Sequence, residues 1–157
     1  MKLTRRAFSK LAGTGAAVVA APQLFAPAIA QDKPLKIGII APRSGVAGTA
    51  GECGIRAVQW AAERMNKEGG IAGRKFELVI EEETNPKDTI ERFRRLVLQE
   101  KVESVHGLIS TGVSLGVAPV AEEEQSLLVM WDGTTQDGVK EVMPKSRYVF
   151  LLDRQRV

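Results

Sequence analysis

The sequence contains few of the residues from which enzyme sites and disulfide-bonded folds are usually built. Its 157 residues include one cysteine, Cys53, and one histidine, His106, and only 5% of the residues are aromatic. A single cysteine excludes an internal disulfide, and a single histidine excludes a metal site built on several histidines. We interpret Cys53 as a small, half-buried helix residue and His106 as a packing residue within a strand.

Long hydrophobic runs are also absent, because no stretch approaches the roughly 20 apolar residues of a membrane-spanning helix. The apolar stretch Leu11–Ala21 is short and rich in Ala and Gly. It follows four basic residues and precedes the small-x-small sequence Ala28–Ala30. This order is typical of an export signal. We expect cleavage after Ala30 and a soluble product in the periplasm.

The basic segment at the start of this signal, Thr4–Lys10, has the sequence TRRAFSK. It resembles the twin-arginine export motif, Ser/Thr-Arg-Arg-x-Phe-x-Lys. The resemblance implies the twin-arginine translocase as a partner during export. A general secretory signal that carries two arginines is the alternative, and either route leads out of the cytoplasm.

The positive charge of the sequence belongs to the signal segment. Residues 1–30 hold four of the 22 Lys and Arg residues and none of the 19 Asp and Glu residues, so the 18 remaining basic residues leave a net charge of −1. A basic surface for nucleic acid is therefore not expected. Of the 157 residues, the 127 that follow residue 30 suffice for one domain.

Strands alternate with helices along the rest of the chain, which predicts an α/β fold: a parallel sheet with helices on both faces. Asn85 is the expected N-cap of a helix that begins at Pro86, with Ile90, Phe93 and Val97 on its inward face. The predicted strands are Leu35–Pro42, Lys75–Glu83, Ser104–Ile109, Leu127–Trp131 and Tyr148–Leu152, and the other predicted helices are Gly51–Lys67 and one that ends near Gln125.

Ligands of parallel α/β folds bind outside the carboxyl ends of the strands. Four loops of the predicted fold meet this condition, and they are Arg43–Ala50, Glu82–Pro86, Ser110–Ser114 and Asp132–Gln136. Any binding site is expected to be built from these loops.

Nucleotide binding and catalysis find little support in these loops. Gly45, Gly48 and Gly51 have a G-x-x-G-x-x-G spacing in place of the dinucleotide G-x-G-x-x-G, and no Gly-Lys-Ser/Thr follows them. Glu81–Glu83 imitate the ribose-binding acid of dinucleotide folds, but we interpret them as a solvated strand end. Glu122–Glu124 are expected on the exposed side of a helix. No acid/base pair, cofactor or metal is predicted.

Two of the strand-end loops carry short hydroxyls next to glycine. Ser110, Thr111 and Gly112 lie where a helix is expected to begin, with Ser114 close behind them, and Gly133, Thr134 and Thr135 follow the fourth strand. Backbone amides at a helix N-terminus favour an anion. The second loop offers oxygens that accept hydrogen bonds from an ammonium group. Together the loops predict a receptor for a zwitterion, although each hydroxyl alone is equally consistent with a helix cap or a turn.

The segments Lys36–Gly45, Ala61–Pro86, Ile109–Glu123 and Leu127–Thr135 together resemble the type I periplasmic binding proteins of ABC transporters, the group of the leucine/isoleucine/valine-binding protein. The segment Asn66–Arg74 is the most specific part of the resemblance. It implies a lobe with flavodoxin-like strand order that performs no chemistry and needs no cofactor. The implied function is to bind a branched-chain amino acid, or a related small carboxylate or amide, and to deliver it to a membrane permease.

The resemblance also implies roles for individual residues. Ser110, Thr111 and Gly112 correspond to the loop that holds the ligand carboxylate, and Gly133 and Thr135 to the loop that holds the amino group. Three further positions depart from the family pattern or bear on ligand shape. Ala50 stands where a tyrosine usually covers the ligand, Trp131 could supply an aromatic wall, and Arg43 could pair with a second carboxylate.

Family members have two lobes that close on the ligand, so residues 31–157 are expected to be an N-terminal lobe with an incomplete second lobe, as in a truncated reading frame. A single lobe leaves the ligand solvated and should bind weakly. A ligand-sensing binding module is the nearest alternative function, and an exported Rossmann-like oxidoreductase is the alternative among enzymes.

Overall fold

The computed structural model describes residues 33–131, 136–142 and 144–152. The predicted signal, 1–30, lies outside these ranges. The strands form a five-stranded parallel sheet in the order β2-β1-β3-β4-β5, which confirms the α/β fold and the flavodoxin-like strand order. The strands are β1 (Leu35–Ala41), β2 (Phe76–Glu82), β3 (Ser104–Gly107), β4 (Leu127–Met130) and β5 (Val149–Leu151).

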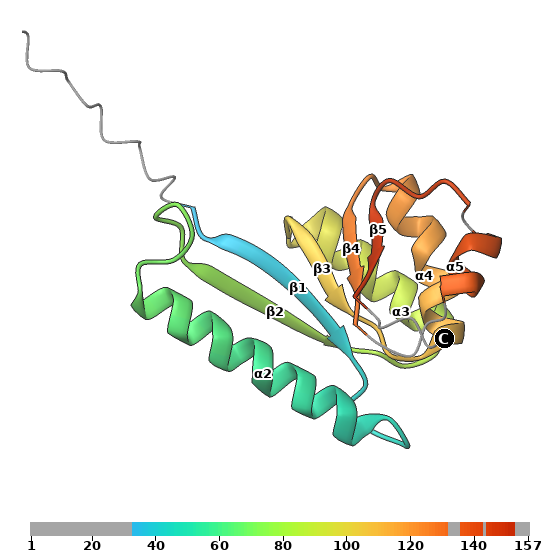
Figure 1. The fold of residues 1–157 in the computed structure, drawn as a ribbon, viewed down its shortest axis with the longest axis horizontal. Helices are drawn as coiled ribbons and strands as arrows, with labels where there is room; N and C mark the ends of the chain where they lie inside the picture. The colour runs from blue at the N-terminus through green and yellow to red at the C-terminus, as the bar shows by residue number, and fades with distance from the viewer. Residues whose placement is uncertain (1–32, 132–135, 143, 153–157) are drawn as a thin grey trace, which may run out of the picture. The chain divides into compact units, whose positions relative to one another are not determined.

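Helices cover both faces of this sheet, as Figure 1 shows: α2 lies on one face, and α3, α4 and α5 lie on the other. A π-helical turn, η1, continues α3, and α5 was not expected from the sequence. The helical segments are α2 (Gly48–Lys67), α3 (Pro86–Arg94), η1 (Arg95–Gln99), α4 (Thr111–Glu123) and α5 (Gln136–Val142).

Two element boundaries differ from prediction in ways that matter for the carboxyl edge of the sheet. The strand β3 ends at Gly107 and not at Ile109, because Gly107 (φ 128°) and Leu108 (φ 61°) leave the extended region. Helix α2 begins at Gly48, three residues earlier than expected. Ala50 is therefore an exposed residue of the first turn of α2 and does not lie in the preceding loop.

The main hydrophobic core lies between the sheet and the three helices α3, α4 and α5. Alternate residues of the strands point into it, as expected for a pleated sheet. On α3 and η1, Phe93 and Leu96 are fully buried, whereas Ile90 and Val97 are only partly buried. Leu96, which was not predicted, therefore also faces the core. The most deeply buried members of this core are Ile40, Phe93, Leu96, Val105, Leu108, Val117, Ala118, Ala121 and Leu128.

The opposite face of the sheet has a smaller apolar layer under α2, which packs on β1 and β2. A pocket of about 120 Å³ lies in this layer, lined by apolar side chains of α2, β1 and β2 together with His106 and Trp131. By register, Phe150 of β5 faces the same side as Val129 and His106. Phe150 is 53% exposed, so α2 does not cover this end of the sheet.

The lone histidine is a half-buried residue of β3, which confirms its interpretation as a packing residue. Its Nε2 atom lies 3.0 Å from Ser104 Oγ. Burial lowers the pKa of His106 below its ordinary value, because desolvation disfavours the charged imidazolium.

This lowered pKa predicts how His106 affects stability. As pH falls, His106 of the unfolded chain becomes protonated near pH 6.5, whereas His106 of the folded chain becomes protonated only at a lower pH. The free energy of unfolding should therefore fall as pH drops below about 6.5, by at most about 1.4 kcal/mol per pH unit. Below the pKa of the folded state the loss stops growing. Urea unfolding of wild type and His106→Gln between pH 7.5 and 5 would measure it. The variant should show the smaller slope, and equal slopes would contradict the prediction.

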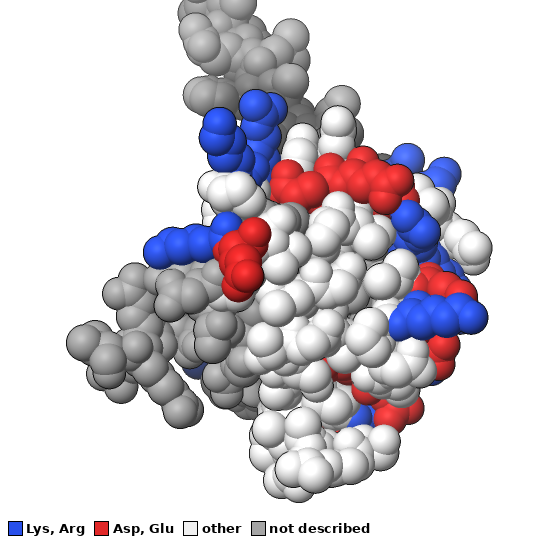
Figure 2. Space-filling view, turned by 90° about the vertical axis from the view of Figure 1, so that its right-hand side faces the viewer, with Lys and Arg blue, Asp and Glu red and all other residues white. Residues whose placement is uncertain are grey.

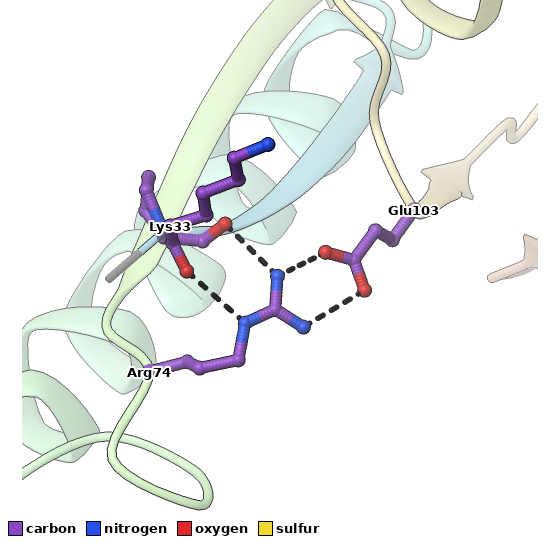
Figure 3. Close-up of polar contacts among 4 residues, drawn as sticks. Lys33, Arg74 and Glu103 are labelled. Carbon is purple, nitrogen blue, oxygen red and sulfur yellow. Dashed lines mark hydrogen bonds and ion pairs between the residues drawn. The ribbon is translucent and has the colours of Figure 1, made fainter. Parts of the chain in front are cut away.

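The segment that carries the strongest family resemblance, Asn66–Arg74, ties elements together at the amino edge of the sheet. The Asn66 amide donates to Phe76 O at 3.0 Å and accepts from Phe76 N at 2.7 Å. The Arg74 guanidinium donates to the carbonyls of Lys33 and Pro34 and forms a two-pronged ion pair with Glu103 (Figure 3). That pairing lowers the pKa of the Glu103 carboxyl. The segment therefore supports the fold and lies away from the strand-end loops.

Cys53 differs from its expected place, because it is exposed on α2 and not half-buried. Across the described residues, no three side chains of the His, Cys, Asp and Glu types converge to hold a metal ion. The helices within the same ranges include none that is both long and apolar enough to cross a bilayer.

Candidate functional site

The segment from the end of β3 into the first turn of α4 lies at the carboxyl edge of the sheet and contains three of the predicted site residues. Ser110 is the N-cap of α4, and Thr111 and Gly112 are its first two residues. The segment leaves β3 through two residues of positive φ, Gly107 and Leu108. The second is unusual for a leucine, whose side chain here is fully buried. Strained backbone of this kind persists only where the surrounding structure holds it, and it is common at functional sites.

Ser110 occupies the N-cap position of α4, but its hydroxyl makes no capping hydrogen bond. The first helical hydrogen bond runs from Ser114 N to Ser110 O at 2.9 Å. Ser110 and Thr111 are half-buried and Gly112 is exposed. Apart from the adjoining residues and the backbone of α4 itself, a methyl group added at Gly112 would meet no atom of the described residues within 4 Å. The start of α4 is therefore accessible to a small molecule.

The side chains of the first turn of α4 are uncharged. The backbone amides of the first turn of a helix have no acceptor within the helix, and the helix dipole adds positive potential there. Helix α4 carries no charged side chain before Glu122. Figure 2, which views the molecule from the right-hand side of Figure 1, shows a broad area without charged side chains that is bordered by acidic and basic side chains. An anion at this position would be held by amides and hydroxyls. Ser114 is fully buried and thus belongs to the core.

Glu83 is the residue of this edge that sequence reasoning missed. It was interpreted with its neighbours as a solvated strand end, which is wrong for Glu83, since only 4% of it is exposed. Its carboxylate accepts hydrogen bonds from Ile109 N and Ser110 N, each at 2.8 Å. Two charge-assisted hydrogen bonds offset the cost of burying the carboxylate. The other two acids have partners too, Glu81 with Arg95 and Glu82 with the Ser44 hydroxyl.

The second predicted loop, Gly133, Thr134 and Thr135, lies outside the described residues. Its starting point is nevertheless fixed, because β4 pairs with β3 and Trp131 N donates to Gly107 O at 2.9 Å. The chain therefore leaves β4 beside the β3–α4 loop. The joint use of the two loops stays a prediction.

Two further side chains singled out from the sequence have partners within the protein. Arg43 is exposed and forms an ion pair with Glu52 at 2.7 Å, and this pairing raises the pKa of the Arg43 guanidinium. The ring of Trp131 is half-buried and packs in the apolar layer under α2, against Gly54. A second carboxylate of a ligand would therefore have to compete with Glu52 for Arg43.

In this parallel α/β lobe, the N-terminus of α4 lies at the carboxyl edge of the sheet and the Ser110 hydroxyl does not cap it. This arrangement is typical of proteins that bind a small ligand at the strand ends. The sequence profile of the periplasmic binding protein family matches residues 34–155. The chain belongs to this family.

Curated relatives agree with this assignment. Leu/Ile/Val-binding protein homolog 7 of Brucella suis is 30% identical over 99 residues, which cover 63% of this chain and 25% of that protein. Leu/Ile/Val-binding protein BraC3 of Rhizobium johnstonii is 30% identical over 125 residues, 79% of this chain and 33% of the relative. The matched part of the chain thus spans about a quarter to a third of the length of these relatives.

Solved structures give the same result. The branched-chain amino acid transporter substrate-binding protein LivJ of Streptococcus pneumoniae, in complex with isoleucine, superposes with a TM-score of 0.67 at 27% identity, covering 76% of this chain and 33% of LivJ. A solute-binding protein of an ABC transporter from R. palustris, in complex with 4-hydroxybenzoate, has a TM-score of 0.63 at 25% identity and covers 76% and 31%. The family resemblance of the sequence is confirmed, and membership supports the expected periplasmic location.

Proposed function

We propose that this chain is the ligand-binding lobe of an extracytoplasmic solute receptor that supplies an ABC permease with a branched-chain amino acid or a related small carboxylate. The observation that carries the proposal is the open N-terminus of α4, with the Ser110 hydroxyl not used as a cap, in a chain of the periplasmic binding protein family. The lobe binds and releases its ligand and catalyses no reaction. Residues 1–30 are a twin-arginine signal, and residues 31–157 are the N-terminal lobe of the receptor.

The site suits a ligand with a single carboxylate. Ser110, Thr111 and Gly112 hold the carboxylate with hydroxyls and amides, and no cationic side chain of α4 adds to them. Arg43 is already paired with Glu52, which disfavours a dicarboxylate. Isoleucine and 4-hydroxybenzoate, the ligands of the two solved relatives, are both monocarboxylates.

Two classes of ligand bound by relatives can separate the role of the β3–α4 loop from that of Gly133, Thr134 and Thr135. Leucine, isoleucine and valine carry an ammonium group for Gly133, Thr134 and Thr135, whereas 4-hydroxybenzoate carries none. A change at Thr135 should therefore weaken the amino acids alone, and a change at the β3–α4 loop should weaken both classes of ligand.

Thr111 and Gly112 provide the test of this site. In NMR titrations of the 157-residue chain with leucine and with 4-hydroxybenzoate, Thr111→Ala is expected to weaken binding about fivefold to tenfold, the value of roughly one hydrogen bond. Gly112→Ala should weaken it as well, because the added methyl group occupies the open space in front of the helix.

The control for these variants is Gly116→Ala, one turn further along α4, where the added methyl group would lie 3.4 Å from Pro86 Cβ. It should leave affinity unchanged. Thr111 also interacts within the protein, so the Tm of each variant is measured in parallel. Unchanged affinity in both Thr111→Ala and Gly112→Ala would show that the ligand binds elsewhere.

A further inference from the structure

We propose that Glu83 is a positioning residue of the ligand site, which holds the β3–α4 loop so that the N-terminus of α4 faces the ligand. The inference rests on the proposed function, because it gives Glu83 its role through the carboxylate-binding loop. Glu83 itself need not touch the ligand.

The geometry of the contact is specific. One carboxylate oxygen of Glu83 accepts from Ile109 N and the other from Ser110 N, both at 2.8 Å. The order β2-β1-β3 places a whole strand between the two partners, so the side chain reaches across the end of β1. Glu83 thereby links two strand-end loops that are 26 residues apart in the sequence.

The two hydrogen bonds to Glu83 hold the part of the loop between the end of β3 and the start of α4. Gly107 and Leu108 both have positive φ, and the hydroxyl of Ser110 does not cap α4. Leu108 N donates to Ile40 O at 2.8 Å, which fixes where the loop begins. The two bonds to Glu83 then fix Ile109 and Ser110, the residues directly before the proposed ligand contacts.

Because the amides of Ile109 and Ser110 donate to Glu83, they are not available to the ligand. A carboxylate is the right group for this task. It presents two acceptors and no donor, whereas a carboxamide of the same shape presents one acceptor and a donor that would face a backbone N–H. Glu83→Gln therefore keeps the volume of the side chain but should displace the loop.

The test compares Glu83→Gln with its neighbour Glu82→Gln. Glu82 is the matched control, since its carboxylate accepts from the Ser44 hydroxyl at 3.0 Å, whereas the amides of Ile109 and Ser110 both donate to Glu83. NMR spectra of the ligand-free proteins record the amide resonances of Ile109 and Ser110. Titrations with leucine and 4-hydroxybenzoate, at a temperature well below each Tm, record the affinity.

We expect Glu83→Gln to shift the amide resonances of Ile109 and Ser110 and to weaken both ligands by about tenfold, the effect of losing a hydrogen bond to a charged group. Glu82→Gln should leave both readouts unchanged. If Glu83→Gln does not fold, Glu83→Asp provides the comparison. It keeps the charge but is one methylene shorter, so it should weaken both ligands by a smaller factor.

Each contrary result has a separate meaning. If Glu83→Gln lowers Tm but binds as wild type does, Glu83 supports only the fold and the inference is wrong. If it binds the carboxylates more tightly, the charge of Glu83 opposes the ligand and positioning is overturned. Equal weakening by Glu82→Gln would also overturn it. A wild-type chain that binds neither ligand fails at an earlier step, because that result rejects the proposed function and with it any ligand for Glu83 to serve.

Discussion

Replacing Gly107 by alanine is expected to lower the free energy of unfolding by about 3 kcal/mol or more. Two causes act together. The residue has a φ of 128°, a conformation that side chains with a Cβ rarely adopt. An added Cβ would also lie 1.9 Å from Ile40 O, a backbone atom of the neighbouring strand that cannot move aside as a flexible side chain could.

The same close approach explains why the effect should reach the candidate site. Leu108 N donates to Ile40 O at 2.8 Å, and Trp131 N donates to Gly107 O at 2.9 Å. A Cβ at residue 107 would push β1 and β3 apart at their carboxyl ends, where the loops that follow these two strands begin. The expected result is a less stable protein in which the remaining folded molecules bind ligand more weakly.

Urea unfolding followed by circular dichroism measures the change, with Gly116→Ala as the control. Gly116 lies inside α4, and an added Cβ there would make an ordinary contact of 3.4 Å with Pro86 Cβ. Alanine is the better helix former by up to about 1 kcal/mol, so this variant should be as stable as wild type or more so. Similar destabilisation by both substitutions would contradict the assigned role of Gly107.

The fold was predictable because its signals are local. Alternation of apolar strands with helices predicted the parallel sheet, and a short polar residue before Pro86 predicted where α3 begins. The structure confirms the second point in detail, since the side chain of Asn85 accepts from Asp88 N at 3.0 Å. A cap, a turn and an amphipathic period are each written in a few consecutive residues.

The tertiary contacts of two acids, the buried Glu83 and the half-buried Glu122, could not be predicted in the same way. Glu83 and Glu122 both stand in runs of three glutamates, a pattern typical of solvated surface. Each nevertheless accepts hydrogen bonds from two successive backbone amides: Ile109 and Ser110 for Glu83, and Arg147 and Tyr148 for Glu122. These amides are 25 to 27 residues away in the sequence. The one usable signal was the position of Glu83 inside a predicted strand-end loop.

The inward face of α3 shows an intermediate case. Helical spacing from Phe93 predicted that Val97 faces inward, but Val97 is only partly buried, whereas Leu96 is fully buried. The π-helical turn at Arg95–Gln99 changes the angle between successive residues, so the period of a regular α-helix no longer assigns the face. Phe93, which precedes that turn, was assigned correctly.

Phe93→Ala is expected to lower the free energy of unfolding by about 3 to 5 kcal/mol, the usual cost of removing a buried aromatic ring from a packed core. Phe93 is fully buried and is the largest of the fully buried side chains among the described residues. It lies in the cluster shared by α3, α4 and the sheet, and α3 packs directly on α4. The cavity left by the ring would be closed only if these elements moved.

The matched control is Leu98→Ala in the adjoining turn, where the leucine is 56% exposed. It should change the free energy of unfolding by no more than about 0.5 kcal/mol. Because the ring lies beneath α4 and not in its open first turn, ligand affinity measured on folded Phe93→Ala protein should stay near the wild-type value. If Phe93→Ala loses much of its ligand affinity without losing stability, α3 takes part in the site itself. If Leu98→Ala is as destabilising as Phe93→Ala, the prediction is wrong, because it depends on the difference between a core and a surface side chain.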